Sequence, residues 1–147
     1  PFDEVNTYIT SSFSDKMATL VEQKFIEAEC TFQISGAAGA HPIYLSAVTM
    51  ALEAEGISAA DIATYLGQAS VDPGAASLTL EHIMNQKYLG MFLHSETFTD
   101  WRRTGFPTLT PNNGSSVPRR FPVPQSERNL NLANIPAASI YSSVDWD

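Results

Sequence analysis

Two stretches of apolar residues at helical spacing dominate the first third of the chain, and a short segment of glycine and alanine separates them. In the first stretch the apolar positions are Met17, Leu20, Val21, Phe25, Ala28 and Phe32. In the second they are Tyr44, Ala47, Val48, Ala51 and Leu52. Glycines at both ends of the segment 36–39 interrupt the pattern, and Gly56 ends the second stretch. The spacing predicts helices over residues 14–34 and 41–55, with Pro42 in the first turn of the second.

Two helices of this length, joined by a short turn, are expected to pack as an antiparallel hairpin. Small residues on the facing sides, Ala28, Ala47 and Ala51, permit a close approach. Residues 1–56 are therefore predicted to form a helical hairpin similar to a tetratricopeptide unit. No second copy follows at a period of about 34 residues.

A second helical region is predicted over residues 57–104. A short helix at 59–67 has Asp61 in its first turn, and a turn follows at Asp72-Pro73-Gly74. A longer helix at 79–103 is expected to continue or bend at Gly90 and Ser95. Its predicted apolar face comprises Leu80, Ile83, Met84, Tyr88, Met91 and Phe92.

The remaining residues, 105–147, have the composition of a proline-rich loop and a coil tail. Five prolines and two glycines lie between Gly105 and Pro124, which disfavours helix. The tail beyond Glu127 has weak periodicity, and we expect Leu130, Leu132, Ile135 and Trp146 to hold it down. The predicted fold class is all-α with long irregular loops: a helical hairpin followed by helices and a coil C-terminal region.

The charge is unevenly distributed along the chain. The net charge is −8, but residues 1–101 carry 3 basic and 13 acidic side chains, whereas residues 102–147 carry 5 basic and 3 acidic ones. The acidic first part disfavours nucleic acid as a partner, because Lys and Arg supply most of such affinity. Pairing of the arginines with carboxylates of the same chain is the favoured use of the basic end.

A motif near the end of the helical region resembles a known family. The chain reads Asp100-Trp101-Arg102-Arg103-Thr104-Gly105, continues through a Pro-Arg-Arg-Phe-Pro segment at 118–122, and closes on Val144-Asp145-Trp146-Asp147. This order resembles the C-terminal region of SusD/RagB-like proteins, the surface glycan-binding lipoproteins that partner TonB-dependent transporters in Gram-negative bacteria.

The resemblance implies the function and the context of the chain. It implies a non-enzymatic protein of the cell outer membrane that captures oligosaccharides for a SusC-like transporter. Residues 1–147 are then a single C-terminal portion of a larger protein, whose remaining N-terminal part is a further partner. A helical protein-interaction module of tetratricopeptide type is the alternative.

The arginine motif is predicted to be structural. Arg102 and Arg103 fall in the last turn of a helix, where cations offset exposed carbonyls, and Gly105 suits a left-handed cap. Asp100 and Arg103 share one helix face, so we expect them to pair and Arg102 to be more exposed. Arg119, Arg120 and Glu127 are expected to fold back over the same helix end.

Few residues have the pattern of a reactive or metal-binding site. The three histidines are too far apart for a zinc site, so no metal and no cofactor are expected. Candidate carboxylate pairs for glycoside hydrolysis are Glu96 with Asp100 and Asp145 with Asp147. Two arginines beside the first pair disfavour a general acid there, and no catalysis is expected.

The aromatic residues and the single cysteine complete the set of candidates. Trp101 is expected to pack in the core, whereas Tyr141 and Trp146 are candidate sugar-contacting residues, with packing the favoured alternative. Cys30 is expected to be a buried apolar residue.

Overall fold

The computed structural model describes residues 17–112, 114, 116–135, 139–144 and 147. Five α-helices and one 3-10 helix, and no β-strand, occur in these residues, which confirms the predicted all-α class with long loops. The chain divides into two compact units, Pro1–Leu78 and Thr79–Asp147. No helix in the described ranges combines the length and the apolar character needed to span a membrane.

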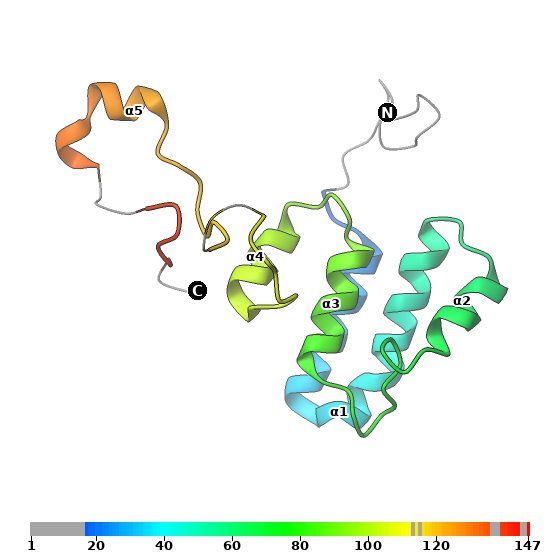
Figure 1. Cartoon of the computed structure of the whole chain (residues 1–147). Helices are drawn as coiled ribbons and strands as arrows, with labels where there is room; N and C mark the ends of the chain where they lie inside the picture. Colours follow the sequence, from blue (N-terminus) through cyan, green and yellow to red (C-terminus); the bar gives the residue numbers. More distant parts are fainter. Residues whose placement is uncertain (1–16, 113, 115, 136–138, 145–146) are drawn as a thin grey trace. The chain divides into compact units, whose positions relative to one another are not determined.

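The first unit is built on α1, Leu20–Ala54, which folds back on itself (Figure 1). Gly36 has φ 73° and ψ −174°, a conformation that is essentially restricted to glycine, and the chain reverses direction there. The predicted hairpin is therefore present, but the segment between its two halves is shorter than the predicted one, residues 35–40. α1 begins at Leu20, because Thr19 caps it by accepting a hydrogen bond from Glu22 N at 3.1 Å. The predicted start at residue 14 lies outside the described residues. Pro42 lies inside the second half rather than at its start.

The facing sides of the hairpin supply the core of the first unit. Small and aromatic side chains alternate there, and the fully buried ones are Phe25, Ala28, Ala40, Tyr44 and Ala47. Cys30 is exposed, contrary to expectation, because it lies off this stripe. The alanines on the stripe allow the two halves to approach closely, as predicted.

A short helix and a turn cover the end of the hairpin. α2, Ala59–Leu66, lies where a helix was predicted and starts after Ser58, whose hydroxyl accepts from Asp61 N at 3.2 Å. The turn beyond α2 is attached to α1 by two polar contacts: the hydroxyl of Tyr44 donates to the carbonyl oxygen of Val71, and His41 Nε2 lies 2.6 Å from Asp72 Oδ1. The hydrogen bond with His41, followed by that from Gly74 N, lowers the pKa of Asp72.

The second unit begins with two helices where one was predicted. α3, Leu80–Gly90, and α4, Glu96–Thr104, are separated at residues 91–95, where Leu93 adopts φ 67°. A non-glycine residue in this left-handed region cannot continue a helix. The break changes the predicted apolar face: Ile83, Met84 and Met91 are buried, but Tyr88 and Phe92 are exposed.

The rest of the second unit is irregular, as its proline content predicted. Of its described residues beyond α4, those in regular structure form α5, Gln125–Leu130, and the 3-10 helix η1, Leu132–Asn134. Leu130 and Leu132 are mostly exposed, so they do not hold the tail down as expected. Trp146 lies outside the described residues.

The backbone conformation of Gly36 leads to a stability prediction. Gly36→Ala should lower the free energy of unfolding by about 2 kcal/mol, because alanine is strained at this φ and ψ, although an added Cβ would meet nothing within 4 Å. Urea unfolding of the full chain measures the difference. Gly67→Ala is the matched control, because Gly67 has φ −71° and should change stability by less than about 1 kcal/mol. Equal losses in the two variants would contradict this account of the reversal.

Candidate functional site

Helix α4 is the element on which the polar and aromatic groups of the second unit converge. Its C-terminal end has the predicted cap: Gly105 has φ 78° and its N–H donates to the carbonyl oxygen of Trp101 at 2.8 Å. Arg102 and Arg103 occupy the last turn, where their charges offset the free carbonyl groups. The two arginines point to different partners and therefore have different roles.

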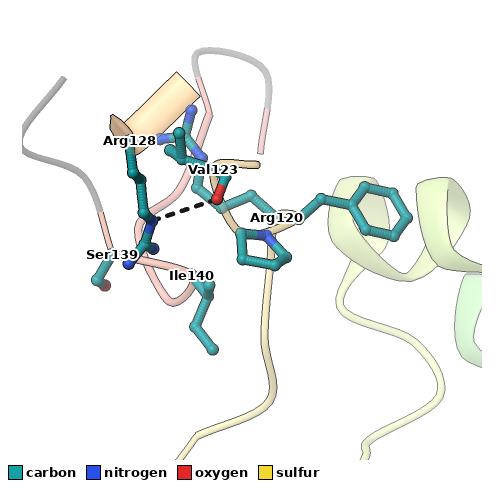
Figure 2. A pocket seen from close by; sticks show the side chains of 7 residues that line it. Arg120, Val123, Arg128, Ser139 and Ile140 are labelled. Atoms are coloured by element: carbon teal, nitrogen blue, oxygen red, sulfur yellow. Dashed lines mark hydrogen bonds between the residues drawn. The ribbon is translucent and has the colours of Figure 1, made fainter. Parts of the chain in front are cut away.

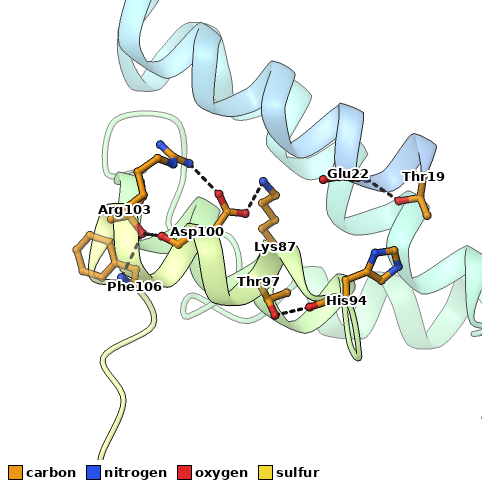
Figure 3. Close-up of polar contacts among 9 residues, drawn as sticks. Thr19, Glu22, Lys87, His94, Thr97, Asp100, Arg103 and Phe106 are labelled. Atoms are coloured by element: carbon orange, nitrogen blue, oxygen red, sulfur yellow. Dashed lines mark hydrogen bonds and ion pairs between the residues drawn. The ribbon is translucent and has the colours of Figure 1, made fainter. Parts of the chain in front are cut away.

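Asp100 lies between two cations (Figure 3). Its Oδ1 accepts from Arg103 Nη2 at 2.9 Å, which is the predicted pair. Its Oδ2 lies 2.6 Å from Lys87 Nζ of α3, and the Lys87 side chain is only 5% exposed, against 41% for Arg103. The buried partner of Asp100 is therefore Lys87, which the sequence analysis did not identify. The signal for it was its position on the same face of α3 as Ile83 and Met84.

Arg102 is the more buried of the paired arginines, which corrects the sequence-based prediction. Its side chain is 12% exposed, and its Nε lies 3.2 Å from Asp147 Oδ1. Arg119 binds the other oxygen of the same carboxylate, with its Nε donating to Oδ2 at 3.0 Å. Arg119 Nη2 also donates to the carbonyl oxygen of Arg102 at 3.0 Å. The proline-rich loop thus folds back over the end of α4 through Arg119, as expected, and Asp147 links the two arginines.

Opposing influences act on the pKa of Asp147. Burial of its carboxyl group raises the pKa, whereas the hydrogen bonds from Arg119 and from Val144 N, together with the charges of Arg119 and Arg102, lower it. The net pKa lies below the usual value of 3.8. The carboxylate is therefore ionised wherever the folded protein is studied near neutral pH.

The aromatic residues of α4 pack against these arginines. Phe98 and Trp101 are stacked with ring centroids 6.0 Å apart. The guanidinium of Arg102 lies 5.1 Å from the centroid of Phe98, and that of Arg119 lies 5.2 Å from the centroid of Trp101. Trp101 is 7% exposed, so it is a packing residue as predicted.

An open apolar hollow of about 420 Å³ lies beside α4. Its lining residues are Phe98, Pro118, Arg120, Phe121, Pro122 and Ile140. Phe121 contacts Phe98, with centroids 6.1 Å apart and an interplanar angle of 55°, yet it is 86% exposed. An exposed aromatic ring can stack on the apolar face of a sugar.

A second, smaller hollow of about 130 Å³ lies next to the first and is more polar (Figure 2). Both hollows share Arg120, Phe121, Pro122 and Ile140, and the second adds Val123, Arg128 and Ser139. Arg128 is held in place by the hydrogen bond that its Nε donates to the carbonyl oxygen of Val123 at 3.2 Å. Guanidinium groups in such a hollow can bind an anionic group.

The remaining residues that the sequence analysis named as site or motif residues lie in different parts of the second unit or outside the described residues. Tyr141 is 46% exposed, and its hydroxyl would lie 3.9 Å from a Cβ added at Gly114. Glu127 lies on α5 and accepts a hydrogen bond from Asn131, so it does not join the end of α4. Arg120 lines both hollows rather than the helix end. Trp146 and Asp145 lie outside the described residues.

Sequence reasoning missed Phe121 and Arg128. The sequence gives no local signal for the exposure of Phe121, because it depends on how Arg119 and Arg120 are anchored to Ile140. Arg128 gave no signal, because its proximity to residues 120–123 depends on how α5 folds back.

The carboxylates and histidines considered for catalysis or metal binding have other contacts in the structure. Asp100 is bound to both Lys87 and Arg103, so each of its carboxylate oxygens already has a partner within the second unit. His82 caps α3, where its Nδ1 lies 2.7 Å from the hydroxyl oxygen of Thr79. Among the residues with described positions, no group of three or more His, Cys, Asp or Glu side chains could hold a metal ion.

Comparison with known proteins gives one match. The model of the SusD-like family, described as starch-binding and associating with the outer membrane, matches residues 4–124. This range covers nearly all of the first unit and the first part of the second, and it ends before Arg128, Ser139 and Ile140 of the smaller hollow. No curated protein and no solved structure gave a significant match.

The two cations that bind Asp100 should differ in their effect on stability. Lys87→Met should cost about 3 kcal/mol, because it removes the buried partner of a carboxylate, whereas Arg103→Ala should cost about 0.5 kcal/mol, as expected for an exposed pair. Thermal or urea unfolding of the full chain measures both values. A larger loss for Arg103→Ala would show that the exposed cation is the main partner of Asp100.

The lowered pKa of Asp147 predicts a loss of stability in acid. Its ionised form is favoured in the folded state, so the contribution is fully present above the unfolded pKa and is lost as the pH falls through the lower folded pKa. The amide hydrogens of residues 139–144 should therefore lose protection, measured relative to the intrinsic exchange rate at each pH, when the pH is reduced below about 4. In Asp147→Asn the exchange at neutral pH should already be fast, and an unchanged acid profile in that variant would contradict the assignment.

Proposed function

The chain belongs to the SusD-like family of starch-binding proteins that associate with the outer membrane, and on this premise we propose that it is part of a non-enzymatic component of an outer-membrane glycan uptake system. The component captures oligosaccharides and passes them to a TonB-dependent transporter of SusC type. The observation that carries the proposal is the family match over residues 4–124, which covers most of the chain.

The proposed context is a lipoprotein at the cell surface. Residues 1–147 form a C-terminal portion of this protein, and the N-terminal remainder supplies further contacts to the glycan. The second unit supports a role in binding, because it displays the exposed ring of Phe121 beside an open hollow. Tyr141 is a further candidate for stacking on a sugar, since its ring is also partly exposed.

The polar groups of α4 favour binding over hydrolysis. A glycosidase needs two carboxyl groups, one of which keeps its proton at neutral pH. Both carboxylate oxygens of Asp100 are occupied by ion pairs, Oδ2 with Lys87 and Oδ1 with Arg103. The alternative function, a tetratricopeptide-type interaction module, is supported by the single hairpin of α1 alone.

Isothermal titration calorimetry of the whole protein against a panel of neutral and acidic oligosaccharides tests the proposal. At least one class should bind, and no oligosaccharide should release new reducing ends during prolonged incubation. Glu96→Ala and Asp100→Ala should leave this absence of turnover unchanged, with a stability loss confined to Asp100→Ala. Hydrolysis that disappears in either variant would replace the binding function with a catalytic one.

A further inference from the structure

Two arginines in the second unit line the same hollow, and no acidic residue is among the described residues that line it. Arg120 and Arg128 both face the hollow of about 130 Å³ shown in Figure 2. The main chain of Arg120 is fixed by its N–H, which donates to the carbonyl oxygen of Ile140 at 3.1 Å, whereas the side chain of Arg128 is fixed by its Nε, which donates to that of Val123. The hollow also contains Ser139 at its rim.

The other arginines near α4 already have carboxylate partners. Arg102 and Arg119 bind Asp147, and Arg103 binds Asp100. No ion pair of Arg120 or Arg128 occurs within the described parts of the chain. Two guanidinium charges that line one small hollow repel each other. An anion bound between them attracts both, and the sum of the three electrostatic interactions becomes favourable. Because guanidinium groups bind carboxylate and sulfate in bidentate geometry, the hollow is complementary to such a group.

The neighbouring apolar hollow is suited to the ring that carries this anion. It shares Arg120, Phe121, Pro122 and Ile140 with the charged hollow, so one ligand can contact both. Its volume of about 420 Å³ falls within the range of roughly 300–1,000 Å³ found for small-molecule sites. The face of Phe121 is exposed to contact the C–H groups of a pyranose.

We propose that residues 120–123, together with Arg128, form a subsite for an acidic sugar. The carboxylate or sulfate group of the sugar lies between Arg120 and Arg128, and the apolar face of its ring lies against Phe121. This inference rests on the proposed function and adds to it a preference for glycans that bear uronic acids or sulfate esters.

Calorimetry of the whole protein with three probes tests the subsite. The probes are an oligogalacturonide, a sulfated oligosaccharide and maltohexaose, which supply a carboxylate, a sulfate and no charge. Arg120→Gln and Arg128→Gln should each weaken binding of an acidic probe about tenfold, the loss expected for one charge-assisted hydrogen bond. Binding of that probe should also weaken with rising salt, and Arg120→Lys should restore part of it.

Controls separate the subsite from general effects. Lys24→Gln removes one positive charge from the first unit, where Lys24 pairs with Glu27, and should leave binding of all three probes unchanged. Melting temperatures of the variants confirm that each is folded. The acidic probe that binds more tightly identifies whether carboxylate or sulfate is the natural group.

The outcomes distinguish this inference from the proposed function. Loss of acidic-probe binding in the two glutamine variants, with any maltohexaose binding retained, supports the subsite. Binding of glycans that is unaffected by both variants overturns the subsite and leaves the proposed function standing. Failure of the whole protein to bind any oligosaccharide in the wider panel overturns both.

Discussion

The carboxylate of Asp147 holds the irregular part of the second unit against helix α4. Its two oxygens lie 3.2 Å from Arg102 Nε and 3.0 Å from Arg119 Nε. In the described residues between α4 and α5 there is no helix or strand to fix the chain by regular backbone pairing. The side chain of Arg119 replaces that pairing, since it also binds the carbonyl oxygen of Arg102 and lies over the ring of Trp101.

The position of Arg119 determines what its neighbours display. The N–H groups of Arg119 and Arg120 both donate to the carbonyl oxygen of Ile140, so residue 120 is fixed in the same arrangement. The ring of Phe121 is then exposed beside Phe98, and Phe121 lines both hollows. The arginines of this region therefore divide into two groups: Arg102, Arg103 and Arg119 stabilise the fold, and Arg120 and Arg128 are left for a ligand.

The helices could be predicted from the sequence because their signals are local. Apolar spacing, the start of α2 with Asp61 in its first turn and the left-handed Gly105 depend on residues within a few positions of each other. The cap at Thr19 was not predicted. The break between α3 and α4 was missed, because nothing in the local pattern requires Leu93 to adopt a positive φ. The reversal at Gly36 was predicted, but the early start of the second half of α1 was not.

The contacts of the site were harder to predict because they join residues far apart in sequence. Helical spacing paired Asp100 with Arg103 correctly, but it gave no information on Lys87 or Asp147. Without Asp147, an arginine at position 102 appears free to point into solvent, which is why its exposure was predicted wrongly. Phe121 was missed for the same reason: its exposure follows from the anchoring of Arg119 and Arg120.

Arginine-selective labelling with phenylglyoxal, followed by mass spectrometry, tests the division of the arginines most directly. The whole protein is labelled with and without a saturating acidic oligosaccharide, and the rate at each arginine is compared. The account predicts rapid labelling of Arg120 and Arg128 that the ligand suppresses, and slow labelling of Arg102 whether or not the ligand is present. Labelling of Arg102 as fast as that of Arg128, or no protection of Arg120 and Arg128 by bound ligand, would contradict it.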